Sequence, residues 1–105
     1  AFQRLEEAVK QKKKVLVDVT ASWCVSCKVN ESVVLNRPDI KQFLADNNID
    51  FIVLDWTNYD DDITAYLESF NGQGVPLYVY YDENGNTTLL PQILQKEDIY
   101  QLKEK

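Results

Sequence analysis

The chain has 105 residues, 45% of them hydrophobic and 27% charged, which is typical of one globular domain over residues 1–105 and excludes a disordered, collagen-like or coiled-coil protein. The 17 acidic and 11 basic residues give a net charge of −6. Because binding to nucleic acid needs clustered cations, we expect no nucleic-acid partner.

The spacing of apolar residues predicts five helices and four strands. In chain order they are a helix over 2–12, a strand over 15–20, helices over 24–35 and 38–44, a strand over 51–54, a helix that follows the acids 60–62 and ends at 72–74, strands over 77–81 and 87–90, and a helix over 97–103. A turn at 83–86 makes the last two strands antiparallel. Strands that alternate with helices predict an α/β fold, with a mixed sheet of about four strands flanked by helices on both faces.

Three absences narrow the function. No apolar run approaches the roughly 18 residues of a membrane span. The chain has no Met, so we expect a processed protein or a domain excised from a larger one. It has no His, which excludes Ser–His and Cys–His catalysis and His-ligated metals within this chain.

The two cysteines carry the strongest chemical signal. Residues 23–28 read Trp-Cys-Val-Ser-Cys-Lys, at the point where a strand passes into a helix. The spacing puts both sulfurs on one helical face, with Cys24 at the helix N-terminus, where free N–H groups stabilise a thiolate. Cys27, one turn in, is expected to be less exposed. One thiolate would attack a partner's disulfide and the other would resolve the mixed disulfide.

Three other interpretations of the cysteine pair remain open. A structural zinc site is disfavoured, because two sulfurs cannot supply four ligands. A structural disulfide would close only a four-residue loop. Two inert buried thiols are disfavoured by Trp23 and Lys28, which favour a partly exposed, electropositive setting. No metal and no organic cofactor is expected, only a redox-active Cys24–Cys27 disulfide.

Two carboxylates accompany the cysteines. Asp18 interrupts an apolar strand, where an ionised carboxylate is costly to bury, and this strand leads into the cysteine turn. There it would accept the proton of Cys27; the alternative is a strand-end acid with a hydrogen-bonding partner. Glu31, four residues after Cys27 on the same helical face, is either a second proton-handling carboxylate or a solvated helix acid.

The remaining aromatic residues are interpreted as packing residues rather than a ligand site. They are Trp56 and the tyrosines at 78, 80 and 81. Pro76 is tolerated at the start of a strand, and the sequence pattern alone does not indicate the isomer of its peptide bond.

The segment over 17–28, Val-Asp-Val-Thr-Ala-Ser-Trp-Cys-Val-Ser-Cys-Lys, resembles the active-site motif of the thioredoxin superfamily, and Gly-Val-Pro at 74–76 resembles the Gly-x-Pro that faces it. The resemblance implies a thioredoxin fold over nearly the whole chain. It also implies that Cys24 is the nucleophile, Cys27 the resolving thiol, Asp18 the buried acid of the family, and Val75–Pro76 a cis peptide bond.

A more specific resemblance is to the C-terminal periplasmic domains of the DsbD family, including relatives linked to copper tolerance. It is carried by Cys-Val-Ser-Cys-Lys-Val-Asn-Glu at 24–31, Asp-Trp-Thr at 55–57 and Leu-Leu-Pro at 89–91. Glu31 matches a carboxylate beside the cysteines of that family. The resemblance implies a monomeric periplasmic domain of an inner-membrane protein, with a membrane electron-transfer domain as donor and a periplasmic thiol domain or protein as acceptor.

The function expected from these features is disulfide reduction. No His stands between the cysteines, so we expect a reduction potential nearer to the roughly −270 mV of thioredoxin than to the roughly −120 mV of a strong oxidant. Two alternatives are a free-standing thioredoxin-like reductant and a non-catalytic interaction module with the same fold. Turnover of a model disulfide would separate the module from the enzymes.

Overall fold

The computed structural model describes residues 2–72 and 74–104. Its elements, in chain order, are α1 (Phe2–Lys10), β1 (Lys14–Thr20), α2 (Val25–Asn30), a π-helical turn η1 (Glu31–Leu35), α3 (Pro38–Asp46), β2 (Ile49–Asp55), α4 (Asp61–Ser69), β3 (Leu77–Tyr81), β4 (Thr87–Leu89), α5 (Lys96–Tyr100) and a 3-10 turn η2 (Gln101–Glu104). The predicted order of helices and strands is confirmed. None of the helices in these two described ranges is long and apolar enough to cross a membrane.

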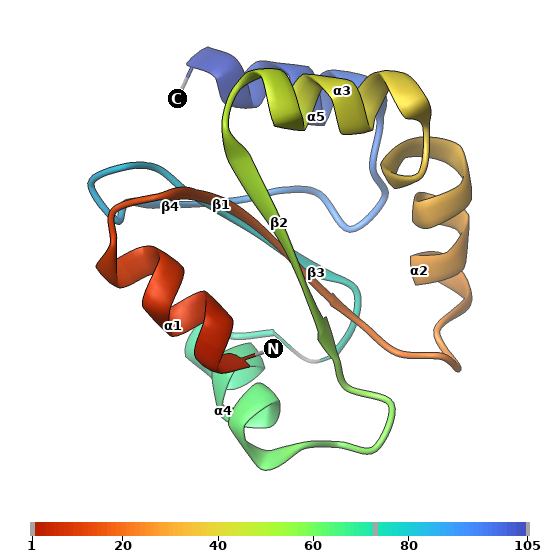
Figure 1. The fold of residues 1–105 in the computed structure, drawn as a ribbon. Coiled ribbons are helices and arrows are strands. Elements are labelled where there is room, and N and C mark those ends of the chain that lie inside the picture. The colour runs from red at the N-terminus through yellow and green to blue at the C-terminus, as the bar shows by residue number, and fades with distance from the viewer. Residues whose placement is uncertain (1, 73, 105) are drawn as a thin grey trace.

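The four strands form one mixed sheet in the order β2-β1-β3-β4 (Figure 1). β1 pairs with β2 in parallel and with β3 in antiparallel orientation, and β3 and β4 form the predicted antiparallel pair. The long β-branched strand β1 therefore lies inside the sheet, and the short β4 lies at one edge.

Helices cover both faces of the sheet, as predicted (Figure 1). Along β1, Val15, Val17 and Val19 belong to the core formed with α1 and α4, whereas Leu16 belongs to the core formed with α3, η1 and α5. Successive side chains of a strand point to opposite faces, so Asp18 shares the face of Leu16. The candidate acid thus points to the side of the sheet on which α2 lies.

Several predicted boundaries differ from the structure. The helix expected over 24–35 begins only at Val25, because Cys24 is its N-cap, and its second half is the π-helical turn η1. The last helix tightens into 3-10 geometry from Gln101 onward. The predicted helix end at 72–74 includes Gln73, which lies outside the described residues, while α4 itself ends at Ser69.

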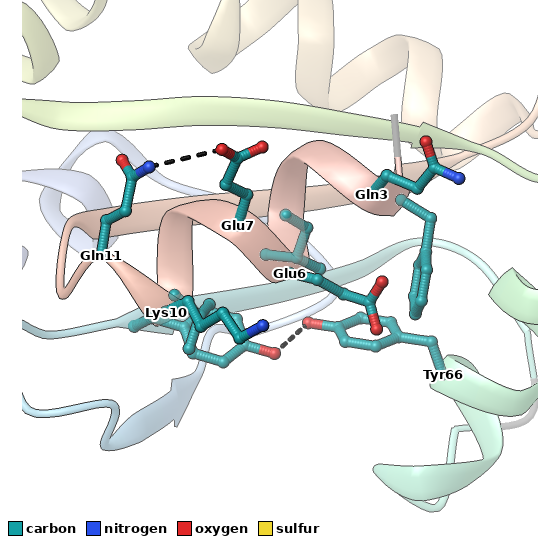
Figure 2. A pocket seen from close by; sticks show the side chains of 10 residues that line it. Gln3, Glu6, Glu7, Lys10, Gln11 and Tyr66 are labelled. Atoms are coloured by element: carbon teal, nitrogen blue, oxygen red, sulfur yellow. Dashed lines mark hydrogen bonds between the residues drawn. The ribbon is translucent and has the colours of Figure 1, made fainter.

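The packing role predicted for the three tyrosines is confirmed. Tyr78 and Tyr80 are almost fully buried, and Tyr81 is 9% exposed. A surface pocket lies between α1 and Tyr66 on the face opposite α2 (Figure 2). The hydroxyl groups of Tyr66 and Tyr81 form one hydrogen bond there at 2.6 Å, in which one hydroxyl donates and the other accepts.

The acids at 60–62 have the structural role that their position predicts. Asp60 is the N-cap of α4, and its Oδ1 accepts the N–H of Ile63 at 3.1 Å. Replacing Asp60 with Ala should lower the free energy of unfolding by about 1 kcal/mol, because the cap bond is lost. Asp60→Asn retains a capping oxygen and is the matched control in denaturant titrations. Equal losses in both variants would contradict the capping role.

Candidate active site

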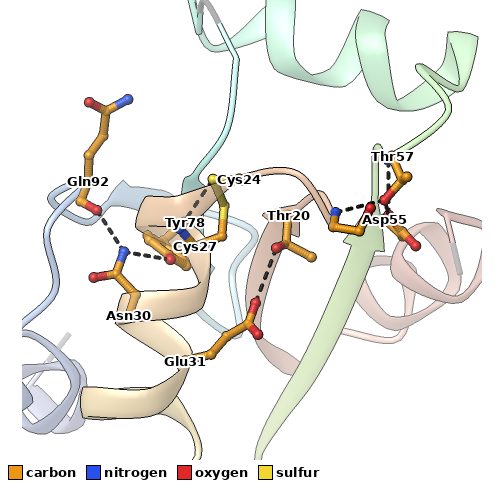
Figure 3. Close-up of a disulfide and its surroundings, with 10 residues drawn as sticks. Thr20, Cys24, Cys27, Asn30, Glu31, Asp55, Thr57, Tyr78 and Gln92 are labelled. Atoms are coloured by element: carbon orange, nitrogen blue, oxygen red, sulfur yellow. Dashed lines mark hydrogen bonds between the residues drawn. A yellow bond between two sulfur atoms is a disulfide. The ribbon is translucent and has the colours of Figure 1, made fainter.

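Cys24 and Cys27 form a disulfide at the start of α2, with their Cα atoms 5.3 Å apart (Figure 3). As N-cap, Cys24 has extended backbone geometry, and its sulfur accepts the N–H of Cys27 at 3.2 Å. Cys24 is 6% exposed and Cys27 is fully buried, so the predicted difference in exposure is confirmed. Cys24 is less exposed than the expected partly exposed setting, because Ala21 and Val75 pack around the disulfide.

The segment that packs against the disulfide contains the cis peptide bond that the resemblance implies. Val75–Pro76 is cis, and Val75 contacts the cluster formed by Ala21 and both cysteines. Gly74, just before it, has φ +150°, a conformation that side-chain-bearing residues rarely adopt. Residues about 50 positions downstream of the cysteines therefore form one wall of the site.

Asp18 is buried without a partner for one of its oxygens. Its side chain is 2% exposed, and Oδ1 has no hydrogen bond. Burial, and to a lesser extent the negative charge of Glu31, raise the pKa of Asp18 from its ordinary 3.8 to about 7. The alternative of a strand-end acid with a satisfied hydrogen bond does not describe this side chain, because Oδ1 has no partner. A buried carboxyl group with a pKa near 7 is a candidate for proton exchange near neutral pH.

Glu31 is half-buried at the junction between α2 and η1. Its Oε2 accepts the hydroxyl of Thr20 at 3.2 Å, at the end of β1 (Figure 3). Its negative charge is also the second cause of the raised pKa of Asp18. It is therefore not a freely solvated helix acid, and it joins the helix of the cysteines to the strand of Asp18. Single π-helical turns of this kind are frequent at functional sites.

Trp23 lies beside the disulfide in an exposed aromatic cluster. It is 48% exposed, donates its indole N–H to the carbonyl of Thr57 at 3.1 Å, and stacks on Tyr59 with ring centroids 5.7 Å apart. Trp56 packs against the same two rings. Lys28 is exposed in the last turn of α2.

Sequence reasoning missed three residues that support the site. The hydroxyl of Thr57 accepts the backbone N–H of Ser22, directly before Trp23, and Tyr59 supplies the stacking ring. Asn30 is a buried polar residue in α2 with three side-chain hydrogen bonds. Their partners are 34 to 64 residues away in the chain, so no local pattern indicates these contacts. In the described residues, no group of three or more Cys, Asp and Glu side chains is arranged to hold a metal ion.

The four-stranded sheet, the disulfide at the N-terminus of α2 and the adjacent cis-proline together define a thioredoxin-fold domain with a Cys-x-x-Cys centre. Residues 3–83 match the family model described as thioredoxin-like, and the chain belongs to this family.

Two groups of known proteins make this placement more specific. The chain is 37% identical over 76 residues to the thiol:disulfide interchange protein DsbD of Haemophilus ducreyi, and 30% identical over 93 residues to that of Actinobacillus pleuropneumoniae. These matches cover 72% and 81% of this chain but only 13% and 16% of the relatives. The oxidised C-terminal domain of Neisseria meningitidis DsbD has the same fold, with a TM-score of 0.78 and 22% identity over 99% of this chain and 94% of that domain.

Proposed function

We propose that this domain is a thiol:disulfide oxidoreductase that works as a disulfide reductase. It accepts two electrons at the Cys24–Cys27 pair and passes them to the disulfide of a protein partner. The observation that carries the proposal is the position of the pair: Cys24 caps α2, where helix N–H groups favour a thiolate, and Cys27 lies buried one turn behind it.

The exchange proceeds in two steps, attack on the partner's disulfide and then resolution of the mixed disulfide. The Cys24 thiolate attacks one sulfur of the partner's disulfide, that S–S bond breaks, and the other partner sulfur leaves as a thiolate. The Cys27 thiolate then attacks Cys24, which forms the Cys24–Cys27 disulfide and releases the second partner thiolate. The domain loses two electrons and the partner gains them, with protons completing the partner's two thiols.

Asp18 is the proton acceptor for the second step in this proposal. Cys27 must lose its proton to attack, and it is buried away from water. A carboxyl group whose pKa is raised to about 7 by burial is half ionised at neutral pH, so it can take a proton and return it. Glu31 modulates that exchange through its charge, while Trp23, Lys28, Val75 and Pro76 form the environment of the pair.

The similarity to DsbD supports a place in an electron relay. The donor would be a membrane electron-transfer domain, the acceptor a periplasmic thiol domain or protein, and this chain a monomeric periplasmic domain of an inner-membrane protein. The reaction needs no organic cofactor and no resident metal, because the Cys24–Cys27 pair accepts two electrons as a disulfide and carries them as a dithiol.

Reduction of insulin by the domain tests the activity. With dithiothreitol as electron donor, the wild-type domain should accelerate the precipitation of insulin chains well above the rate with dithiothreitol alone. Cys24→Ser removes the attacking sulfur and is the matched control, expected to give the background rate. A wild-type domain that also gives only the background rate is the result expected of a non-catalytic interaction module.

A further inference from the structure

One hydroxyl group joins the strand of the buried acid to the helix of the cysteines. Thr20 is the last residue of β1, and its Oγ1 donates to Oε2 of Glu31 at 3.2 Å (Figure 3). Asp18 stands two residues earlier in the same strand, so its side chain and that of Thr20 point to the same face of the sheet, with Cα atoms roughly 7 Å apart. The hydrogen bond therefore holds the Glu31 carboxylate on the same face as Asp18 and beside it.

The donor of this hydrogen bond has a fixed position. Thr20 pairs with Asp55 of β2, and its carbonyl accepts the N–H of Trp56 at 2.7 Å. Both contacts are made by the backbone and do not involve the hydroxyl. A β-branched side chain has few allowed rotamers, so a fixed backbone also restricts where Oγ1 can lie. The hydroxyl is thus a preorganised partner for the carboxylate.

The acceptor has a fixed backbone but a flexible side chain. The N–H of Glu31 donates to the carbonyls of Cys27 and Lys28, and its own carbonyl accepts the N–H of Asn36 at 2.8 Å. A Glu side chain has several rotatable bonds and gains rotamer freedom when no partner holds it. Without the hydroxyl of Thr20, the half-buried carboxylate is free to turn toward solvent, and the position of its charge is no longer fixed.

We propose that Thr20 is a positioning residue for the proton transfer at the cysteine pair, because it holds the charge of Glu31 beside the proton acceptor Asp18. This inference rests on the proposed function. A negative charge close to a buried carboxyl group favours the protonated form of that group, whereas a charge that turns into water is screened. Burial is the main cause of the raised pKa of Asp18, and the charge of Glu31 is the second. Thr20 therefore helps to set the pH at which Asp18 accepts a proton.

Other ionisable groups come from each element around the two carboxylates. They are Tyr78 of β3, Cys24 and Cys27 at the start of α2, Lys28 of α2, and Asp55 of β2. Burial raises the pKa of Tyr78 above its ordinary 10.0, so this side chain is neutral at pH 7. The cysteines are joined in the disulfide, Lys28 is exposed, and the Asp55 carboxylate is bound by Thr57. The charge that Thr20 controls is that of Glu31.

The test is the titration of the Asp18 carboxyl group in the oxidised domain, followed by carbon NMR and assigned with Asp18→Asn. Thr20→Val removes the hydroxyl but keeps the β-branched shape, so the midpoint should move to lower pH by about 0.5 unit, less than the roughly one to three units that a close charge produces. Thr20→Ser retains a hydroxyl and is the matched control, expected to keep the wild-type midpoint. The inflection of the pH–rate profile of insulin reduction should move in the same direction as the midpoint.

A double-mutant cycle shows whether Thr20 acts through Glu31. In the Glu31→Gln background the charge is absent, so the addition of Thr20→Val should produce no further shift of the midpoint. A merely structural Thr20 would lower the free energy of unfolding in both backgrounds and leave both midpoints unchanged.

Thr20→Ala, which also lacks the hydroxyl, replaces Thr20→Val if that variant does not fold. An unchanged midpoint overturns the inference, and so does a further shift in the Glu31→Gln background. A wild-type domain that does not reduce insulin refutes the proposed function instead. The NMR titration needs no turnover, so in that case it still decides whether Thr20 positions the charge beside Asp18.

Discussion

Cys27→Ser should convert the domain into a stable trap for its partners. After Cys24 attacks a protein disulfide, no second thiolate remains to resolve the intermediate, so the mixed disulfide through Cys24 accumulates. Incubation of the reduced variant with insulin should give a covalent adduct on a non-reducing gel, and dithiothreitol should release it. Mass spectrometry of the digested adduct should find the linkage at Cys24.

The reciprocal variant is the control for this result. Cys24→Ser leaves only the fully buried Cys27, so it should form no adduct on the same time scale. In the reduced wild-type domain, iodoacetamide should likewise alkylate Cys24 much faster than Cys27. Trapping by Cys24→Ser alone, or equal alkylation of both cysteines, would show that the assigned roles are wrong.

Asp18→Asn should slow disulfide exchange at neutral pH without lowering stability. The carboxyl group has a pKa of about 7, raised first by burial and second by the charge of Glu31. Without the carboxyl group, Cys27 loses its proton acceptor, and the rate of oxidation of the reduced domain at pH 7 should fall on the order of 100-fold, the lower end of what general acid–base catalysis supplies. The wild-type inflection near pH 7 should disappear from the pH–rate profile of the variant.

The stability of the same variant follows from the direction of the pKa shift. Because the folded state holds the proton of Asp18 more tightly than the unfolded chain, wild-type stability falls as pH rises from the ordinary value of 3.8 to about 7, and the loss is constant above that. At about 1.4 kcal/mol for each pH unit, the full loss is about 4 kcal/mol. Asn has no charge to bury, so denaturant unfolding of Asp18→Asn should lack this decline and give a stability at pH 8 at least equal to that of wild type.

Glu31→Gln is the matched control for Asp18→Asn. It removes the second cause of the raised pKa while burial remains, so the inflection of the pH–rate profile should move to lower pH by less than the full difference from 3.8. If Asp18→Asn is clearly less stable than wild type at pH 8 and exchanges at the wild-type rate, Asp18 has a structural role and the proton-acceptor role is wrong.

The fold could be predicted almost completely from local patterns. The β-branched strands and the 3.6-residue periodicity of the helices depend on residues close together in the chain, and the structure confirms their order. The difference in exposure between Cys24 and Cys27 was predictable for the same reason, since it follows from one helical turn. The burial of Asp18 was also predictable, because its strand neighbours are apolar and the strand lies inside the sheet.

Features within one element escaped prediction when several local geometries have similar energies. The helix through Glu31 changes from α to π geometry, although its residues are compatible with a continuous α-helix. The change accompanies the contact of Glu31 with Thr20, which is 11 residues earlier on another element. This contact joins two elements, so the local sequence does not indicate it.

The sequence by itself determined the order of elements, the reactive pair and the buried acid, because each depends on neighbours within about one turn or one strand. Only the tertiary structure decided what surrounds them: the stacking of Trp23 on Tyr59, the packing of Val75 on the disulfide, and the hydrogen bonds of Asn30 to Gln92 and Leu94. The stacking joins the segments that follow the parallel strands β1 and β2, whereas the other two contacts form when β3 pairs beside β1 and reverses into β4. Their partners are set by the order and register of the strands, which local propensity does not encode.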